Sequence, residues 1–209
     1  MGSLITAWTL ALALGVRHAS EPDHLVAVST LVAGAPNARR AATLGALWGI
    51  GHSLALLGVG GALLLLHAQL SERTAALFEL AVAGMLLVLG GRSIATAMRL
   101  KRHAHVHAPA HTRRPLIVGL VHGLAGSGAL TALALASMPS LGSGIVYMLC
   151  FGLGSVLGMA GLSGLIGMPL GRLSERLQLR AAALASTGLL SIVVGAAWGW
   201  PLLSRVGAG

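Results

Sequence analysis

Four ionisable side chains stand close together inside an otherwise apolar stretch near the amino terminus. They are His18, Glu21, Asp23 and His24, within the sequence RHASEPDH. Each costs several kcal/mol to bury unless it is paired or coordinated. Imidazole and carboxylate without thiolate suit nickel, cobalt, zinc or copper(II), whereas calcium and magnesium require more oxygen ligands. The pattern therefore predicts a site for a divalent transition-metal cation.

A regular helix cannot bring all four side chains together. At about 100° per residue, His18, Glu21 and His24 fall within about 120° of one another, whereas Asp23 points nearly the opposite way. Pro22 lacks the N–H that would bond the His18 carbonyl, and its ring disfavours helix at Glu21. We therefore expect the helix to break here. The break would turn Asp23 toward the imidazoles and leave backbone groups free to help bind a cation.

Two further histidines lie in apolar stretches. His52 belongs to WGIGHSL, where the small neighbours Gly51 and Ser53 let another helix approach closely, and His122 belongs to GLVHGLAGS. His52 either ligates the metal or orients a ligand by a hydrogen bond, and His122 either ligates or acts as a packing or gating residue. The candidate metal-binding residues are His18, Asp23, His24, His52, Glu21 and His122.

The composition is that of a membrane protein. Of 209 residues, 56% are hydrophobic and 9% are charged, and the mean hydropathy is +0.85. These values exclude a soluble enzyme and make the lipid bilayer a partner. The net charge of +9 resides in short segments between apolar runs, as in cytoplasmic loops, so we expect no nucleic-acid partner. The single Cys150 excludes a disulfide framework and a thiolate cluster.

The hydropathy pattern predicts an all-α bundle of about six transmembrane helices, with the first broken at the metal motif. Most Lys and Arg residues fall in the first, third and fifth loops, so the positive-inside rule places both termini outside and loop 99–114 in the cytoplasm. We expect a multi-pass protein of the bacterial cytoplasmic membrane. The segments lie near 4–34, 41–66, 75–98, 115–138, 142–168 and 182–203.

The two halves of the chain resemble each other. WGIGHSLALLGVGG at 48–61 aligns with FGLGSVLGMAGLSG at 151–164, and Gly15 and His18 align with Gly119 and His122 at nearly the same offset. Three spans per repeat would insert the second repeat upside down, as in many secondary transporters. We expect a first repeat at 1–98, a linker at 99–114 and a second repeat at 115–209.

The linker is rich in histidine. Its sequence RLKRHAHVHAPAHTRRP either collects cytoplasmic metal or is a solvated basic connection. The residues concerned are His103, His105, His107 and His111.

RHASEPDH followed by LWGIGHSL resembles the nickel/cobalt transporter family, and GLVHGLAGSGAL looks like that family's later histidine segment. The resemblance covers the chain and is closest to the short, urease-associated branch that is similar to nickel permeases. It implies a secondary transporter whose substrate is nickel or cobalt, bound by His18, Asp23 and His24 with support from His52. Glu21 and Pro22 depart from the family's usual Asp and Ala.

Other functions remain as alternatives. A metal-binding membrane subunit or sensor would use the same ligands with a partner. AGSG at 125–128 is similar to a rhomboid protease motif, but residues 182–203 contain no histidine to activate Ser127. A carrier of small anions conflicts with two carboxylates in the buried set. We therefore expect no enzyme activity and no resident cofactor, while an exposed glycine face leaves a homo-oligomer open.

Overall fold

The computed structural model describes residues 2–102, 113–173 and 176–207, and these segments are helical without strands. This confirms the all-α prediction. The predicted loop histidines His103, His105, His107 and His111 lie outside the described residues. The helices are α1 (Gly2–His18), α2 (Pro22–Val32), α3 (Ala38–Ala55), the π-helical η1 (Leu56–Gly60), α4 (Gly61–Leu66), α5 (Glu72–Arg102), α6 (Arg113–Ser137), α7 (Leu141–Leu173) and α8 (Leu177–Gly207).

Within the described residues, four helices are long and apolar enough to cross a membrane. They coincide with four of the six predicted segments. The other two predicted segments correspond to α6 and to the pair α1 and α2. The spans are Ala38–Leu66, Glu72–Leu100, Leu141–Leu170 and Leu177–Val206.

The first predicted segment is broken where Pro22 predicts it. Glu21 is extended, with φ −63° and ψ 148°, and Pro22 occupies the first turn of α2, where its missing N–H costs nothing. The expectation of free backbone groups was wrong for the two carbonyls before the break. Ser20 N–H donates to the carbonyl of Arg17 at 2.9 Å, and Glu21 N–H donates to that of His18 at 3.1 Å. A tight turn thus satisfies both oxygens.

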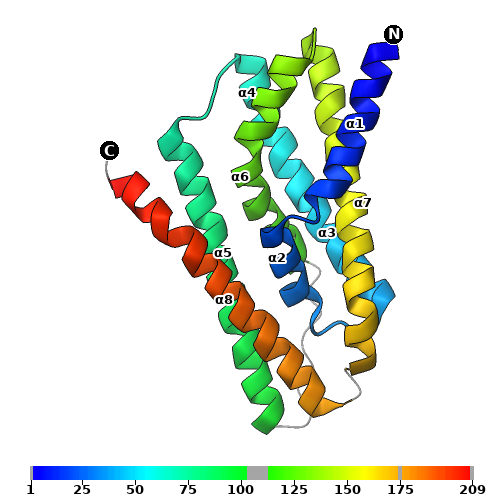
Figure 1. Cartoon of the computed structure of the whole chain (residues 1–209), viewed down its shortest axis with the longest axis vertical. Helices are drawn as coiled ribbons and strands as arrows, with labels where there is room; N and C mark the ends of the chain where they lie inside the picture. The colour runs from blue at the N-terminus through cyan, green and yellow to red at the C-terminus, as the bar shows by residue number, and fades with distance from the viewer. Residues whose placement is uncertain (1, 103–112, 174–175, 208–209) are drawn as a thin grey trace.

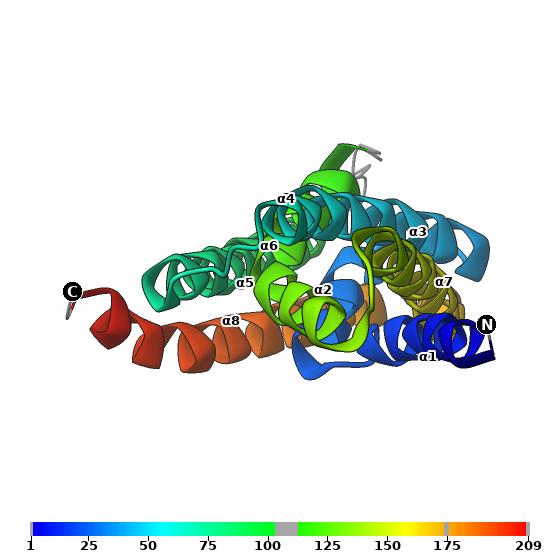
Figure 2. The same ribbon diagram turned by 90° about the horizontal axis from the view of Figure 1, so that it is seen from above.

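The helices form an elongated bundle with α2 and α6 near its middle. Figure 1 shows α5 and α8 side by side on one flank and α1, α3 and α7 on the other. Figure 2 shows the same arrangement from above, with α2 and α6 between the two groups. The helix α2 contacts α3, α5, α7 and α8, and Asp23 and His24 in its first turn are buried although Pro22 is exposed.

Helices of each half of the chain pack against helices of the other half, and we call these exchanged contacts. The helix α1 packs against α7, whereas α6 packs against α3, and the pairs α3 with α7 and α5 with α8 also have large contacts. Glycine permits both exchanged contacts. A Cβ on Gly15 would lie 2.1 Å from the Phe151 carbonyl oxygen, and one on Gly119 would lie 2.0 Å from that of Trp48. Only glycine allows backbones to approach this closely.

Hydroxyl groups link helices inside the apolar layers. Ser53 Oγ donates to the carbonyl of Gly152 at 2.9 Å, and Ser191 Oγ donates to that of Leu86 at 2.7 Å. The first bond joins α3 to α7 and the second joins α8 to α5. Such bonds contribute on average about 0.6 kcal/mol each in membrane proteins, so they specify the helix pairs more than they stabilise them.

The helix that carries His52 changes its winding one turn later. Residues Leu56–Gly60 are π-helical between α3 and α4. The Leu56 N–H, at the start of this segment, donates to the carbonyls of both His52 and Ser53. Wide turns of this kind are frequent at functional sites. The helix then ends at His67, which has the left-handed conformation with φ 50°.

Candidate metal centre

The structure brings all six predicted metal-binding residues into one connected cluster. His18 is the last residue of α1, and Asp23 and His24 lie in the first turn of α2. The other two histidines come from α3 and α6, which pack closely through Gly51 and Gly119. The broken first segment therefore supplies the two carboxylates and two imidazoles, while two further helices supply one imidazole each.

Asp23 is the central acceptor of the cluster. Its Oδ1 lies 3.1 Å from His24 Nδ1, and its Oδ2 lies 2.8 Å from Nε2 of His122. Asp23 lies in the first turn of a new helix, so its side chain does not point in the direction that a continuous helix would give it. Both carboxylate oxygens therefore contact imidazole, as the predicted break requires.

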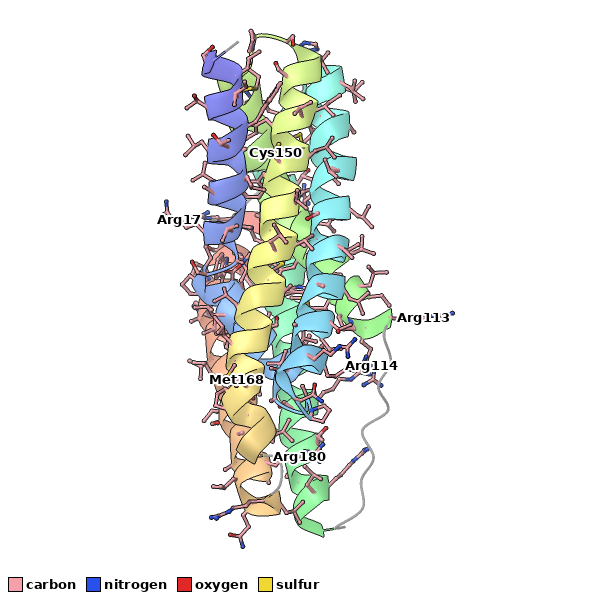
Figure 3. The ribbon with its side chains drawn as sticks, turned by 90° about the vertical axis from the view of Figure 1, so that its right-hand side faces the viewer. Arg17, Arg113, Arg114, Cys150, Met168 and Arg180 are labelled. Atoms are coloured by element: carbon pink, nitrogen blue, oxygen red, sulfur yellow. The ribbon has the colours of Figure 1, made fainter. Side chains whose placement is uncertain are left out.

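His18 connects this cluster to the molecular surface. Its Nε2 lies 3.2 Å from Nε2 of His52, and its Nδ1 lies 3.0 Å from Glu21 Oε1. The side chain of Glu21 is 53% exposed, whereas that of His18 is 15% exposed. Glu21 therefore lies at the rim of the cluster and does not enter it. Arg17, next to His18, projects from the bundle well away from either end in Figure 3.

Three imidazoles of the cluster are almost completely buried. His24 and His52 are each 1% exposed, and His122 is 2% exposed. Each retains one nitrogen without a hydrogen-bond partner: His24 Nε2, His52 Nδ1 and His122 Nδ1. Unpaired polar atoms are costly in a buried setting, so their presence on three neighbouring rings indicates a group adapted to a ligand.

Two overlapping groups have the compactness of a metal site. Among the described residues, the ligand atoms of His18, His24 and His52 lie within 4.8 Å of one another, as do those of Asp23, His24 and His122. Each group offers imidazole nitrogen, and the second adds a carboxylate oxygen. These donors suit nickel, cobalt, zinc or copper(II), and the absence of further oxygen ligands makes them unsuited to calcium or magnesium.

Two aromatic rings that the sequence analysis did not assign line the cluster. Trp48 packs against His24 and His122, with ring centroids 5.4 and 5.6 Å apart, and its buried Nε1 has no hydrogen-bond partner. Phe151 packs against His18 at 5.3 Å. A signal for Trp48 was present, because residues four apart share a helix face and Trp48 precedes His52 by four. Phe151 is its counterpart in the aligned half.

A search of protein-family models finds no match, and no solved structure matches the chain. One curated relative is informative over nearly its full length. The urease accessory protein UreH of Bacillus sp. (strain TB-90) is 33% identical over 204 residues, which cover 92% of this chain and 90% of UreH. The chain belongs to the UreH family.

Two plant relatives of the UreH family member described here are longer than it. The chloroplast proteins FOR GROWTH AND FERTILITY 2 and 1 of Arabidopsis thaliana are 29% and 28% identical, over 95% and 96% of this chain. The chain spans 59% and 62% of their respective lengths. The helical membrane unit is therefore similar to part of each chloroplast protein.

Proposed function

We propose that this protein is a secondary transporter that moves a divalent transition-metal cation, nickel or cobalt, across the cytoplasmic membrane. The observation that carries the proposal is the buried cluster of four histidines and Asp23 with three unpaired imidazole nitrogens. A carboxylate and several imidazoles inside a membrane bundle are costly unless they serve a substrate. The metal ion is the substrate of this site.

Nickel is the favoured substrate because of the family. UreH is a urease accessory protein, and handling of nickel for urease is the role that this relationship supports best. The donor set agrees with nickel and cobalt, which borderline ligands such as imidazole bind well. Neighbouring metals in the affinity series differ little at such a site, so a competition experiment decides among them.

An inverted repeat would provide the movement. The exchanged packing of α1 with α7 and of α6 with α3 supports two structurally related halves, as does the equivalent placement of Gly15 and Gly119. In this proposal, residues 1–98 and 115–209 each contribute three spans and residues 99–114 connect them. Rocking of one half against the other would open the midplane cluster to alternate sides.

The orientation follows from positive charge. In Figure 3, Arg180 lies toward one end of the bundle and Cys150 toward the other, while Arg113 and Arg114 lie between the middle and the Arg180 end. We assign the arginine-bearing end to the cytoplasm, because positive residues are retained there. Both termini would then be outside the cytoplasm.

The test is metal flux into proteoliposomes that contain the purified full chain. Nickel, cobalt, zinc and magnesium are offered in one competition format to wild type, His18→Ala and His24→Ala. We expect saturable nickel or cobalt flux that both variants lose and that magnesium does not inhibit. Flux at the wild-type level in a folded His18→Ala/His24→Ala double variant would overturn this cluster as the transport site, and no metal flux by the wild type would overturn the transporter.

A metal-binding subunit or sensor is the second candidate, because the related UreH is named as an accessory protein. This candidate uses the same histidines but moves no ion by itself. It predicts stoichiometric metal binding to the purified chain, loss of binding in His24→Ala, and no flux in the proteoliposomes. Flux by the purified chain alone excludes it.

A further inference from the structure

We propose that the cluster holds the metal at two stations that share His24, and that one ion passes from the first to the second. The outer station consists of His18, His24 and His52, and the inner station consists of Asp23, His24 and His122. The proposal rests on the transporter function above and adds an order of binding to it. Its tests separate the two claims.

Geometry divides the five residues into these two stations. The ligand atoms within each group lie within 4.8 Å of one another, and His24 is the residue common to both. Its ring lies 4.3 Å from that of His18 and 4.2 Å from that of His122. His52 and His122, which belong to different stations, have ring centroids 5.8 Å apart. His24 is thus positioned between two ligand sets.

The outer station is the one closer to water. His18 carries the contact with the exposed Glu21, whereas the side chains of Asp23, His24 and His122 are at most 10% exposed. Arg17, Ser20 and Glu21 are exposed around the break, and Figure 3 shows Arg17 well away from the ends of the bundle. Charged side chains at membrane depth face water and not acyl chains. An ion therefore reaches the outer station from the Glu21 side.

Charge gives the transfer a direction. The outer station consists of three imidazoles, whereas the inner station contains the carboxylate of Asp23. A divalent cation is attracted more strongly to the station that includes a formal negative charge, especially in a medium of low dielectric constant. Two divalent cations at such adjacent positions would repel each other strongly. The stations are therefore occupied in turn by a single ion.

The aromatic neighbours distinguish the two stations. Phe151 packs against His18 of the outer station, whereas Trp48 packs against His24 and His122. Neither ring offers a ligand, so each limits the directions from which water or further donors reach the metal. Trp48 also provides an intrinsic fluorophore beside the inner station.

Equilibrium binding of Co²⁺ to the purified full chain tests the division, with the visible absorption spectrum as the readout. His52→Ala disables the outer station and His122→Ala disables the inner one. Adding His18→Ala to His52→Ala removes a second ligand from a station that is already disabled. We expect this double variant to bind Co²⁺ within about twofold of His52→Ala and with the same spectrum, because the inner station is untouched.

Variants that disable both stations at once should bind Co²⁺ much more weakly. We expect His52→Ala/His122→Ala and His24→Ala each to lose Co²⁺ affinity by about 100-fold or more, because neither leaves a complete station. Each single variant, His52→Ala or His122→Ala, should bind Co²⁺ yet transport less than about a tenth of the wild-type flux. Ni²⁺ should quench Trp48 in His52→Ala more strongly than in His122→Ala, when Trp8, Trp198 and Trp200 are replaced by Phe.

A single five-ligand site makes the opposite prediction, since each removed ligand weakens binding further. A Co²⁺ affinity at least tenfold lower in His18→Ala/His52→Ala than in His52→Ala would overturn the two stations. Metal flux by the wild type would in that case leave the proposed transport function standing. Wild-type binding without flux would overturn the transporter and leave the binding comparison intact. If an alanine variant fails to fold by circular dichroism and gel filtration, the corresponding glutamine variants replace it.

Discussion

Asp23 Oδ2 lies 2.8 Å from Nε2 of His122, although 99 positions separate the two residues. The contact joins the first turn of α2 to α6, and it links two ionisable side chains, one from the broken first segment and one from the second half of the chain. Asp23 also contacts His24 through its other oxygen. This carboxylate therefore combines two roles, a structural connection between the halves and the formal negative charge of the cluster.

The two roles of Asp23 can be separated by Asp23→Asn. The amide keeps an oxygen acceptor of nearly the same size but loses the negative charge. We expect metal affinity to fall by about 10- to 100-fold while the protein remains folded. Isothermal titration with Ni²⁺ measures the affinity, and Glu72→Gln at the exposed start of α5 is the matched control. Equal affinity in Asp23→Asn and wild type would remove the carboxylate from the metal centre.

We expect Glu21 to affect the capture of the metal ion from solution more than its binding within the cluster. Its half-exposed contact with His18 is screened by solvent, so its loss should have a modest effect. We expect Glu21→Gln to raise the KM for nickel flux by about two- to fivefold, with little change in the maximal rate. The effect should diminish at high ionic strength. A complete loss of flux would instead place Glu21 among the ligands that hold the ion.

Histidine substitution needs a control that leaves the cluster intact. His67 lies at the left-handed end of α4, where asparagine is tolerated. We expect His67→Asn to retain wild-type nickel binding, whereas His24→Ala loses it. Measuring both in the same detergent separates loss of a ligand from a general effect of removing an imidazole.

The exchanged helix contacts predict that the stability of the protein depends strongly on Gly15. A Cβ at Gly15 would collide with the Phe151 carbonyl oxygen, whereas one at Gly84 would meet no atom within 4 Å. We expect Gly15→Ala to destabilise the protein by about 1–3 kcal/mol, and Gly84→Ala to be neutral or to stabilise it by up to about 1 kcal/mol. Thermal unfolding in detergent compares them. A melting temperature for Gly15→Ala at or above that of Gly84→Ala would contradict this packing.

The proposed orientation predicts which surface positions an impermeant thiol reagent reaches. In a Cys150→Ser background, Ser204→Cys near the carboxyl terminus should be labelled in intact cells. Arg114→Cys, beside the proposed cytoplasmic linker, should be labelled only after permeabilisation. Labelling of Arg114→Cys in intact cells would reverse the orientation.

The sequence was sufficient to predict the helical class, the break at Pro22 and the residues of the cluster, because each depends on local chemistry. Buried charges, a proline and apolar length are visible without coordinates. The contact between Asp23 and His122 was not predictable, because it depends on how α2 and α6 pack. The same holds for Trp48, whose apolar ring is ordinary in a membrane helix until its neighbours are known.

One local prediction failed for an instructive reason. Pro22 removes the normal partner of the His18 carbonyl, which suggested a free oxygen for a cation. The chain instead closes a shorter turn, in which the Glu21 N–H takes that oxygen as its acceptor. Sequence indicates that a helical hydrogen bond is lost, but the replacement depends on the conformation of the three residues between the helices.

The exchange of partners between α1 and α6 has a consequence for biosynthesis. The surfaces of α1 and α3 that pack on α7 and α6 have no neighbours until those later helices leave the ribosome. During that interval, Asp23 stands in the nascent first half without His122. Insertion therefore passes through an intermediate in which Asp23 has only His24 of its two imidazole partners and the glycine surfaces of the first half are still open. The finished cluster is thus assembled only when α6 has joined the first half in the membrane.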